Sequence, residues 1–226
     1  MGVCCQTGIA ADKWGMGALT VTVVNGGGVR GLVGLAMAAS RGEPRHITLL
    51  HFRRDEPGAE TRRQHVLRQG SVYEVGRTVV AELPNVRADA QTIKRGTAFK
   101  PVQMLVAAIA YGVEAECSEL VWPLSVDARH EAVGRVSEQV ILLRQITELA
   151  GCTPPKIDMP LLELTDRQII ELGEQLGASW ELAWSCQSDG EKPCLRCGHC
   201  QRRAAAFESA GVVDPAVWPI AGARRR

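Results

Sequence analysis

The sequence of 226 residues has no apolar run long enough to cross a membrane and no excess of charge of one sign. A membrane-spanning helix needs ~20 apolar residues in succession. No basic start leads into an apolar segment, so we see no secretory signal. The formal net charge of +1 argues against a polyanion held by bulk charge. We therefore expect neither a membrane nor a nucleic-acid partner.

A disulfide framework is also lacking, although the chain has eight cysteines. Four of them show no framework spacing: Cys4, Cys5, Cys117 and Cys152. This usage indicates a reducing compartment, and we expect a cytoplasmic protein. With 46% hydrophobic and 23% charged residues, the composition is that of a globular protein that buries a core.

The other four cysteines, Cys186, Cys194, Cys197 and Cys200, have the spacing C-x7-C-x2-C-x2-C. A C-x2-C unit lets two sulfurs reach one ion from a tight turn, and two further thiolates complete a tetrahedral shell. A closed Cys4 shell leaves no position for water, so the spacing predicts a structural zinc site. Two alternatives remain: disulfides, which would close strained small loops, and a [4Fe–4S] cluster, which also takes four cysteines.

Short apolar strands alternate with helices along the chain. Strands are predicted at residues 19–25, 46–52, 78–83, 119–124 and 159–164. Helices are predicted at residues 31–40, 60–69, 101–111, 131–150, 166–176 and 201–210. Thr165 is predicted to cap the fifth helix and Gly177 to end it. The alternation indicates an open, mostly parallel α/β sheet, whose ligands are expected at the carboxyl ends of the strands.

These patterns divide the chain into four segments. Residues 1–17 show no clear period and are predicted to form a loose N-terminal extension. Residues 18–180 are predicted to form the α/β domain. Residues 181–216 are expected to be a small zinc-binding appendage with its closing helix, followed by a tail at residues 217–226.

Three consecutive glycines, Gly26, Gly27 and Gly28, stand between the first predicted strand and the first helix. Backbone N–H groups in such a loop can turn toward an anion, and the helix N-terminus adds a partial positive charge. Arg30 follows at a position where it can meet a phosphate. The alternative is a glycine turn that only links strand to helix. The loop is neither the dinucleotide pattern nor a Walker loop.

The cysteine spacing and the residues after it resemble the C-terminus of the 7-cyano-7-deazaguanine synthase family, which belongs to the PP-loop ATP pyrophosphatases. The resemblance is most specific from Trp184 to Pro215. Upstream, Arg95 to Phe99 is similar to the family's R-N-x-x-F segment, and Leu161 to Gly173 to its P-L-x-x-L helix entry. After the cysteines, the residues that match the family's pattern are Arg203, Ala206, Phe207, Gly211, Asp214 and Pro215.

The resemblance implies a Rossmann-like sheet with helices on both faces, a structural Cys4 zinc, and ATP with magnesium. The implied reaction converts 7-carboxy-7-deazaguanine and ammonia to the nitrile in queuosine and related 7-deazapurine biosynthesis. The candidates for cofactor binding are then Asn25, Gly26, Gly27, Gly28 and Arg30. Arg95 and Asp127 are candidates for binding a purine-like substrate. No catalytic residue is assigned.

The chain departs from the family's pattern in the adenylation apparatus. The family loop S-G-G-x-D-S is replaced here by Asn25 to Arg30, with Val29 in place of the Asp and Arg30 in place of the last Ser. The Y-G-Q and Y-P-D-C-R segments are absent, and the Lys expected after Leu164 is replaced by Asp166 or Arg167. Valine can neither hold magnesium nor orient the loop, so bound ATP and magnesium are in doubt.

We therefore expect a diverged homologue that has lost the standard synthase chemistry. The alternatives are a zinc-stabilised non-catalytic nucleotide-binding or scaffold protein, and a PP-loop ligase that acts on another carboxylate. A homodimer is expected as well, because the helices at residues 101–111 and 131–150 have more apolar surface than one sheet needs.

Overall fold

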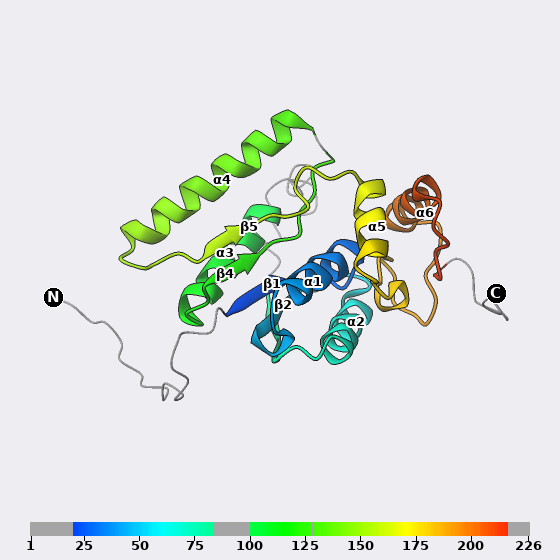
Figure 1. Ribbon diagram of the computed structural model, residues 1–226, viewed down its shortest axis with the longest axis horizontal. Coiled ribbons are helices and arrows are strands. Elements are labelled where there is room, and N and C mark those ends of the chain that lie inside the picture. The colour runs from blue at the N-terminus through cyan, green and yellow to red at the C-terminus, as the bar shows by residue number, and fades with distance from the viewer. Residues whose placement is uncertain (1–19, 84–99, 128, 217–226) are drawn as a thin grey trace.

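The computed structural model describes residues 20–83, 100–127 and 129–216. Figure 1 shows this part of the chain as coloured ribbon. The predicted N-terminal extension, the predicted tail beyond residue 216 and the candidate residue Arg95 lie outside the described residues.

Five parallel strands form a single sheet in the order β3-β2-β1-β4-β5. The strands are β1 (Val21–Val24), β2 (Ile47–Arg53), β3 (Arg77–Glu82), β4 (Glu119–Val121) and β5 (Lys156–Asp158). β1 lies in the centre, where Val21 pairs with Ile47 on one side and with Glu119 on the other. Such a strand is buried on both faces, which explains its continuous apolar, β-branched sequence.

Helices cover both faces of the sheet, as predicted. On one face, Val23, Leu49 and Val121 pack with α1 (Val29–Arg41) and α2 (Ala59–Val72). The next residue along β1 and β2, and the preceding residue of β4, face α3 (Lys100–Glu114) and α4 (His130–Leu149). This alternation follows from the period of two in a strand.

A third core joins α1 to the C-terminal helices α5 (Asp166–Gln175) and α6 (Gly198–Ala210). α5 and α6 lie side by side at one end of the molecule in Figure 1. The centre of this cluster is Phe207, which is 1% exposed and meets Trp180 edge to face. The predicted zinc-binding segment therefore shares its hydrophobic core with the sheet's own helix α1.

The start of α5 has the predicted cap. The Thr165 side chain accepts a hydrogen bond from the backbone N–H of Gln168, and the side-chain oxygen of Gln168 accepts one from the N–H of Thr165. This reciprocal capping box satisfies two N–H groups that a helix start leaves without partners. Gly177 follows the helix with φ of +66°, the left-handed conformation expected there.

The predicted last strand at residues 159–164 is wrong. The strand β5 is Lys156–Asp158, and residues 160–163 form a turn. This turn sends Leu161 into the core around α5 and α6, while Leu162 packs into the core under α3 and α4. The two adjacent leucines thus pack into different cores. In the sequence, their apolar run has the pattern of a buried strand, which explains the wrong prediction.

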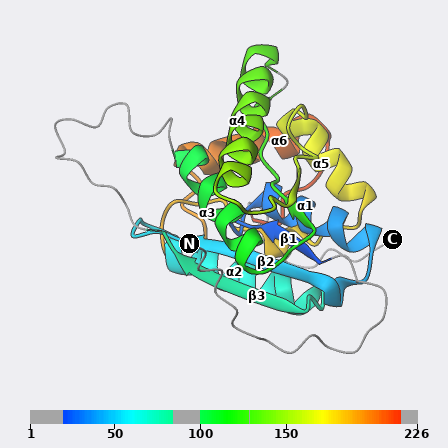
Figure 2. The same cartoon turned by 90° about the vertical axis from the view of Figure 1, so that its left-hand side faces the viewer.

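Two short 3-10 helices complete the described elements, at Pro44–His46 and Trp180–Leu182. Within the ranges that the structure describes, no helix combines the length and the apolar character that crossing a membrane requires. The longest of them, α4, lies at the outer surface in both Figure 1 and Figure 2.

Candidate functional site

The loops after β1 and β4 diverge at the point where the strand order reverses. The chain runs from β1 outward to β2 and β3, and later adds β4 on the opposite side of β1. In open α/β sheets, ligands bind in the crevice that this reversal opens at the carboxyl ends of the strands. A cavity of about 630 Å³ lies there, lined by Gly26, Gly28 and Arg30 after β1 and by Trp122 to Leu124 after β4.

The glycine loop has one position that only glycine satisfies. Gly27 has φ of +78°, and a Cβ atom there would lie 2.7 Å from the backbone oxygen of Arg62 in α2. At Gly26, by contrast, an added Cβ would meet nothing within 4 Å. The loop is therefore fitted tightly against α2 at its second glycine and is open at its first.

Asn25 holds the loop in shape. The side chain is 1% exposed, and its Oδ1 accepts a hydrogen bond of 2.7 Å from the N–H of Gly27. Its Nδ2 donates to Oε1 of Gln69 at 2.8 Å and to the carbonyl of Gly31 at 3.3 Å. Both ends of the amide thus have internal partners, which gives Asn25 a structural task. A role in cofactor binding remains a prediction for Asn25 and for the three glycines.

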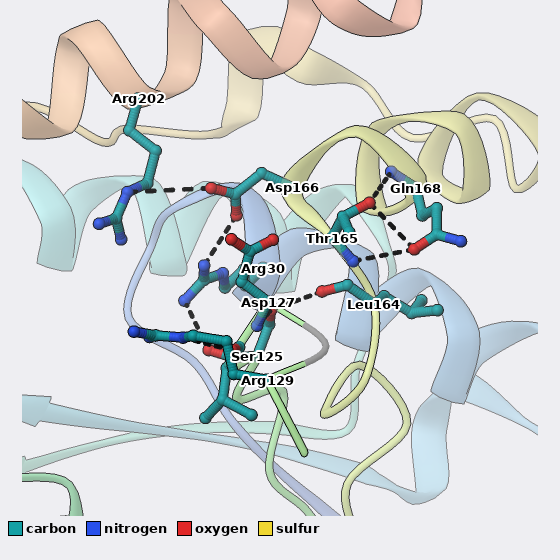
Figure 3. A network of polar contacts seen from close by, with 10 residues as sticks. Arg30, Ser125, Asp127, Arg129, Leu164, Thr165, Asp166, Gln168 and Arg202 are labelled. Atoms are coloured by element: carbon teal, nitrogen blue, oxygen red, sulfur yellow. Dashed lines mark hydrogen bonds and ion pairs between the residues drawn. The ribbon is translucent and has the colours of Figure 1, made fainter. Parts of the chain in front are cut away.

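Arg30 is held by a carboxylate from the far end of the chain. Its Nη2 lies 2.7 Å from Oδ1 of Asp166, at the first position of α5. Its Nη1 donates to the carbonyl oxygen of Ser125 at 3.3 Å. The other oxygen of Asp166 lies 3.8 Å from Nε of Arg202 in α6. Figure 3 shows Asp166 between the two arginines.

The carboxylate of Asp166 neutralises the charge of Arg30, the cation that the sequence indicated beside the glycine loop. Arg30 and Asp166 both line the cavity, and their side chains are 30% and 29% exposed. The start of α1 still offers N–H groups that have no partner within the helix. An anion that reaches Arg30 must, however, compete with a carboxylate already in contact.

Asp127 lies next to this network but outside the lining of the cavity. Its backbone has φ of +60°, and its N–H donates to Oγ of Ser125 at 3.2 Å. That hydroxyl donates to the carbonyl of Leu164 at 2.6 Å. Arg30 and Asp127 therefore both contact Ser125 (Figure 3). A substrate-binding role for Asp127 remains a prediction.

Three residues that the sequence did not assign to a ligand site also line the cavity: His51 and Arg54 at the end of β2, and Trp184 before the cysteines. Nδ1 of His51 lies 2.8 Å from the carbonyl oxygen of Asn25. Burial lowers the pKa of His51, and the charge of Arg62 adds to this effect, while the hydrogen bond to Asn25 opposes it. The available signal was the place of these residues at the C-terminal end of a buried strand, His51 within it and Arg54 directly after it.

The four predicted metal ligands come together. The Sγ atoms of Cys186, Cys194, Cys197 and Cys200 all lie within 4.8 Å of one another. A tetrahedral ion with metal–sulfur bonds of about 2.3 Å sets its sulfurs ~3.8 Å apart, and Cys194 and Cys200 are separated by 4.0 Å. The cluster fits a single metal ion, which these cysteines could hold.

Backbone N–H groups support the cluster. Sγ of Cys186 accepts hydrogen bonds from the N–H groups of Ser188 and Cys194, at 3.4 and 3.3 Å. Cys197 is the N-cap of α6, and Cys200 lies in its first turn. N–H donors and the positive end of a helix both stabilise thiolates, the form that binds metal.

The remaining motif residues of the C-terminal part serve its packing. Arg203 and Asp214 form a buried ion pair, and Phe207 fills the core that α1, α5 and α6 share. Gly211 ends α6 in the left-handed conformation, with φ of +69°. These positions therefore stabilise the fold around the four cysteines.

Comparison with known proteins confirms the resemblance over the C-terminal half of the chain. Residues 102–211 match the family described as queuosine biosynthesis protein QueC. A 7-cyano-7-deazaguanine synthase of Caldicellulosiruptor saccharolyticus is 32% identical over 124 residues, 51% of this chain and 52% of the relative. The synthase of Chromohalobacter salexigens is 34% identical over 97 residues, 43% of this chain and 36% of the relative.

An archaeal synthase, from Archaeoglobus fulgidus, is 44% identical over 63 residues, 28% of this chain and 26% of the relative. The chain thus spans about a quarter to about half the length of these relatives. Among solved structures, the U34-tRNA thiolase NcsA from Methanococcus maripaludis with its [4Fe-4S] cluster is 13% identical. It matches with a TM-score of 0.49, over 83% of this chain and 64% of that chain.

Proposed function

We propose that this protein is a diverged homologue of 7-cyano-7-deazaguanine synthase that binds a purine-like ligand without the standard adenylation chemistry. The carrying observation is the 2.7 Å ion pair between Arg30 and Asp166 at the glycine loop. The match to the family starts at residue 102, so the loop lies outside the matched residues. The similarity therefore supports the fold, the metal centre and the ligand class.

The charge arrangement opposes a triphosphate. Adenylation concentrates negative charge on ATP, and its transition state needs magnesium and oriented donors. Val29 offers no oxygen to a magnesium ion. Asp166 adds a negative charge at the helix start where the family's pattern has a lysine, which is replaced here by Asp166 or Arg167. The loss of one such stabilising group costs ~3–4 kcal/mol in activation free energy, or two to three orders of magnitude in rate.

Zinc is the metal that we propose for the four cysteines. Their sulfurs all lie within 4.8 Å, which suits one tetrahedral ion. In a [4Fe–4S] cluster each cysteine binds a different iron atom, so the sulfurs stand farther apart. A closed shell of four thiolates leaves the metal no open position, and the zinc would stabilise the fold around α6.

The test is pyrophosphate release from ATP with 7-carboxy-7-deazaguanine and ammonia, measured on the metal-loaded protein. We expect no turnover by the wild type. The comparison is a variant that restores the relatives' pattern: Asn25→Ser, Val29→Asp, Arg30→Ser and Asp166→Lys. Activity in this variant alone would support loss of chemistry at the loop.

Robust turnover by the wild type would overturn the proposal and make Arg30 a candidate phosphate ligand. Turnover by neither protein, with the ligand still bound, would support a non-catalytic binding protein. Pyrophosphate release by the wild type with a different carboxylate would point to the second candidate, a PP-loop ligase with another substrate. The buried cation Arg54 in the cavity favours that candidate over a pure scaffold.

A further inference from the structure

The cysteine cluster contains a pair, Cys197 and Cys200, that shares the first turn of α6. Cys197 is the N-cap of the helix and is half-buried, whereas Cys200 is 6% exposed. Three steps along a helix separate two Cα atoms by about 5 Å, which lies within the range that a disulfide spans. The Sγ atoms of the cluster already lie within 4.8 Å of one another. A disulfide between the two cysteines can therefore close without a movement of the helix.

Cys197 is the sulfur of the cluster that is best placed to react with an oxidant. A redox-sensing cysteine is an accessible thiolate with a second cysteine beside it, and C-x2-C is a usual spacing of such pairs. Of the four cysteines, Cys194 and Cys197 are half-buried, and the second of them lies at a helix start with a cysteine in its first turn. Gly198 and His199, which follow it, are exposed, so solvent approaches the pair from this side.

The segment that leads into the cluster is bonded to the glycine loop. The N–H of Trp184, two residues before Cys186, donates to the carbonyl oxygen of Gly27 at 2.8 Å. The same oxygen accepts a hydrogen bond of 3.3 Å from Nε2 of Gln69. Gln69, which is fully buried, also donates to the carbonyl oxygen of Leu182 at 2.9 Å. One set of hydrogen bonds therefore holds both this segment and the loop.

Helix α2 makes a second connection between the cluster and the loop. Nη1 of Arg62 donates to the carbonyl oxygen of Cys186 at 3.4 Å, and Oγ1 of Thr61 donates to Asp189 at 3.4 Å. The backbone oxygen of Arg62 is also the atom that a Cβ at Gly27 would meet at 2.7 Å. The start of α2 thus contacts the residues around the first cysteine and the glycine loop together.

We infer that Cys197 and Cys200 form a reversible oxidation site and that its state controls the glycine loop. The oxidant is a hydroperoxide, with hydrogen peroxide as the probe. The Cys197 thiolate attacks one peroxide oxygen, the O–O bond breaks, and a sulfenic acid and a hydroxide ion form. The Cys200 thiolate then attacks the sulfenic sulfur, the S–O bond breaks, and a second hydroxide ion leaves. Two thiolates thus lose two electrons to the peroxide and form one disulfide.

Oxidation of this pair removes two of the four metal ligands. The thiolates that remain, Cys186 and Cys194, are too few for a tetrahedral zinc site, so the metal is released. The segment from Trp184 to Cys186 then loses its anchor, and the loop that it holds at Gly27 becomes more mobile. Reduction of the disulfide by a thiol reverses the change. The inference goes beyond the proposed function, because it does not depend on which ligand the loop binds.

Hydrogen exchange with mass spectrometry on the metal-loaded full chain tests this assignment. Hydrogen peroxide should produce one disulfide, between Cys197 and Cys200, and should release the metal to a chromogenic chelator. Amide exchange in residues 25–32 should then become about 10-fold faster, the range for the loss of one or two hydrogen bonds. Helix α4 packs on the opposite face of the sheet from α2 and should exchange as before. A thiol reductant with zinc should restore slow exchange in the loop.

Gln69→Met separates the coupling from the oxidation, because it keeps a side chain of similar size but removes the bonds to Gly27 and Leu182. Its loop should exchange fast before peroxide is added and change little afterwards, while the disulfide and the metal release should match the wild type. Gln64→Met is the matched control, since Gln64 is an exposed residue of the same helix and should behave as the wild type does. Cys152→Ser, which removes an exposed cysteine outside the cluster, should also respond as the wild type does.

The absence of a disulfide at a peroxide concentration that oxidises free thiols would overturn the inference, and so would a disulfide between another pair of cysteines. Metal release without faster exchange in residues 25–32 would refute the control of the loop. An equal rise of exchange in α4 would refute it as well, because it would show general unfolding. If Gln69→Met does not fold, removal of the metal from the wild type by a chelator decides. A selective rise in residues 25–32 supports the coupling, and any other pattern overturns it.

Discussion

Arg203 and Asp214 form a bidentate ion pair inside the C-terminal part of the chain. The Nε–Oδ2 and Nη2–Oδ1 distances are both 2.8 Å, and the side chains are 6% and 4% exposed. The same guanidinium donates to the carbonyl oxygens of Ala183 and Trp180. One arginine of α6 therefore connects the segment that leads into the cysteine cluster with the segment that leaves α6.

Asp214→Asn should destabilise the protein strongly, because it leaves a buried guanidinium without its counter-charge. The expected loss is about 3–5 kcal/mol in the free energy of unfolding, measured by urea denaturation. The control is Arg135→Gln, which breaks an ion pair whose side chains are 65% and 86% exposed and should cost less than about 1 kcal/mol. Similar losses for both variants would contradict the structural role of the buried pair.

Gly27→Ala should destabilise the glycine loop, whereas Gly26→Ala should be close to neutral. At Gly27, alanine would meet a left-handed backbone and a backbone oxygen 2.7 Å from its Cβ. The backbone conformation alone costs about 1–2 kcal/mol, and the contact adds to it. Thermal melts of the two variants provide the measurement, and equal melting temperatures would show that α2 does not constrain the loop.

Removal of the metal should destabilise the whole C-terminal core. We expect one zinc ion per chain, and structural zinc sites bind with apparent free energies on the order of 10 kcal/mol. Treatment with a strong chelator should lower the melting temperature, and Cys194→Ser should give metal-poor, protease-sensitive protein. Elemental analysis of protein purified without added metal measures the content.

The control for this prediction is Cys152→Ser, since Cys152 is exposed and lies outside the cluster. It should keep both metal and stability. Less than half an equivalent of any metal, with the four thiols free, would rule out the site. Detection of iron and inorganic sulfide, together with absorption of visible light, would show that the cysteines hold an iron–sulfur cluster and not zinc.

The expected homodimer has a candidate surface on α4. Four apolar side chains of this helix are more than half exposed: Ile141, Leu142, Ile146 and Leu149. Two of them, Leu142 and Ile146, are four positions apart and share one side of the helix. Light scattering should give a dimer for the wild type and a monomer of 24.4 kDa for Leu142→Glu/Ile146→Glu. A monomeric wild type at micromolar concentration would contradict the prediction.

Local patterns were sufficient to predict most of the sheet and the cluster of four cysteines. β1 and β2 are short runs of β-branched and apolar residues, and such runs are typical of strands buried on both faces. The cysteine spacing predicted a cluster that the described side chains indeed form. Both features are encoded by residues close together in the chain, so no long-range information was needed.

The ion pair at the loop shows what the sequence could not supply. Arg30 and Asp166 are 136 positions apart, and nothing in either segment indicates the other as its partner. From the sequence alone, Arg30 is expected to be a free cation beside the glycines. In the folded chain, Asp166 neutralises its charge. The error at residues 159–164 has a similar origin, because only the fold shows that Leu161 and Leu162 belong to different cores.

The central place of β1 in the sheet has a consequence for the order in which a nascent chain can fold. One edge of β1 can pair with β2 early, but the partner at the other edge, β4, comes much later: Thr20 and Ser118, which bond at that edge, are 98 positions apart. At ~5–20 residues per second of translation, this edge waits for several seconds on the ribosome. An open apolar strand edge is a template for aggregation, so this interval is when ribosome-associated chaperones matter most for this chain.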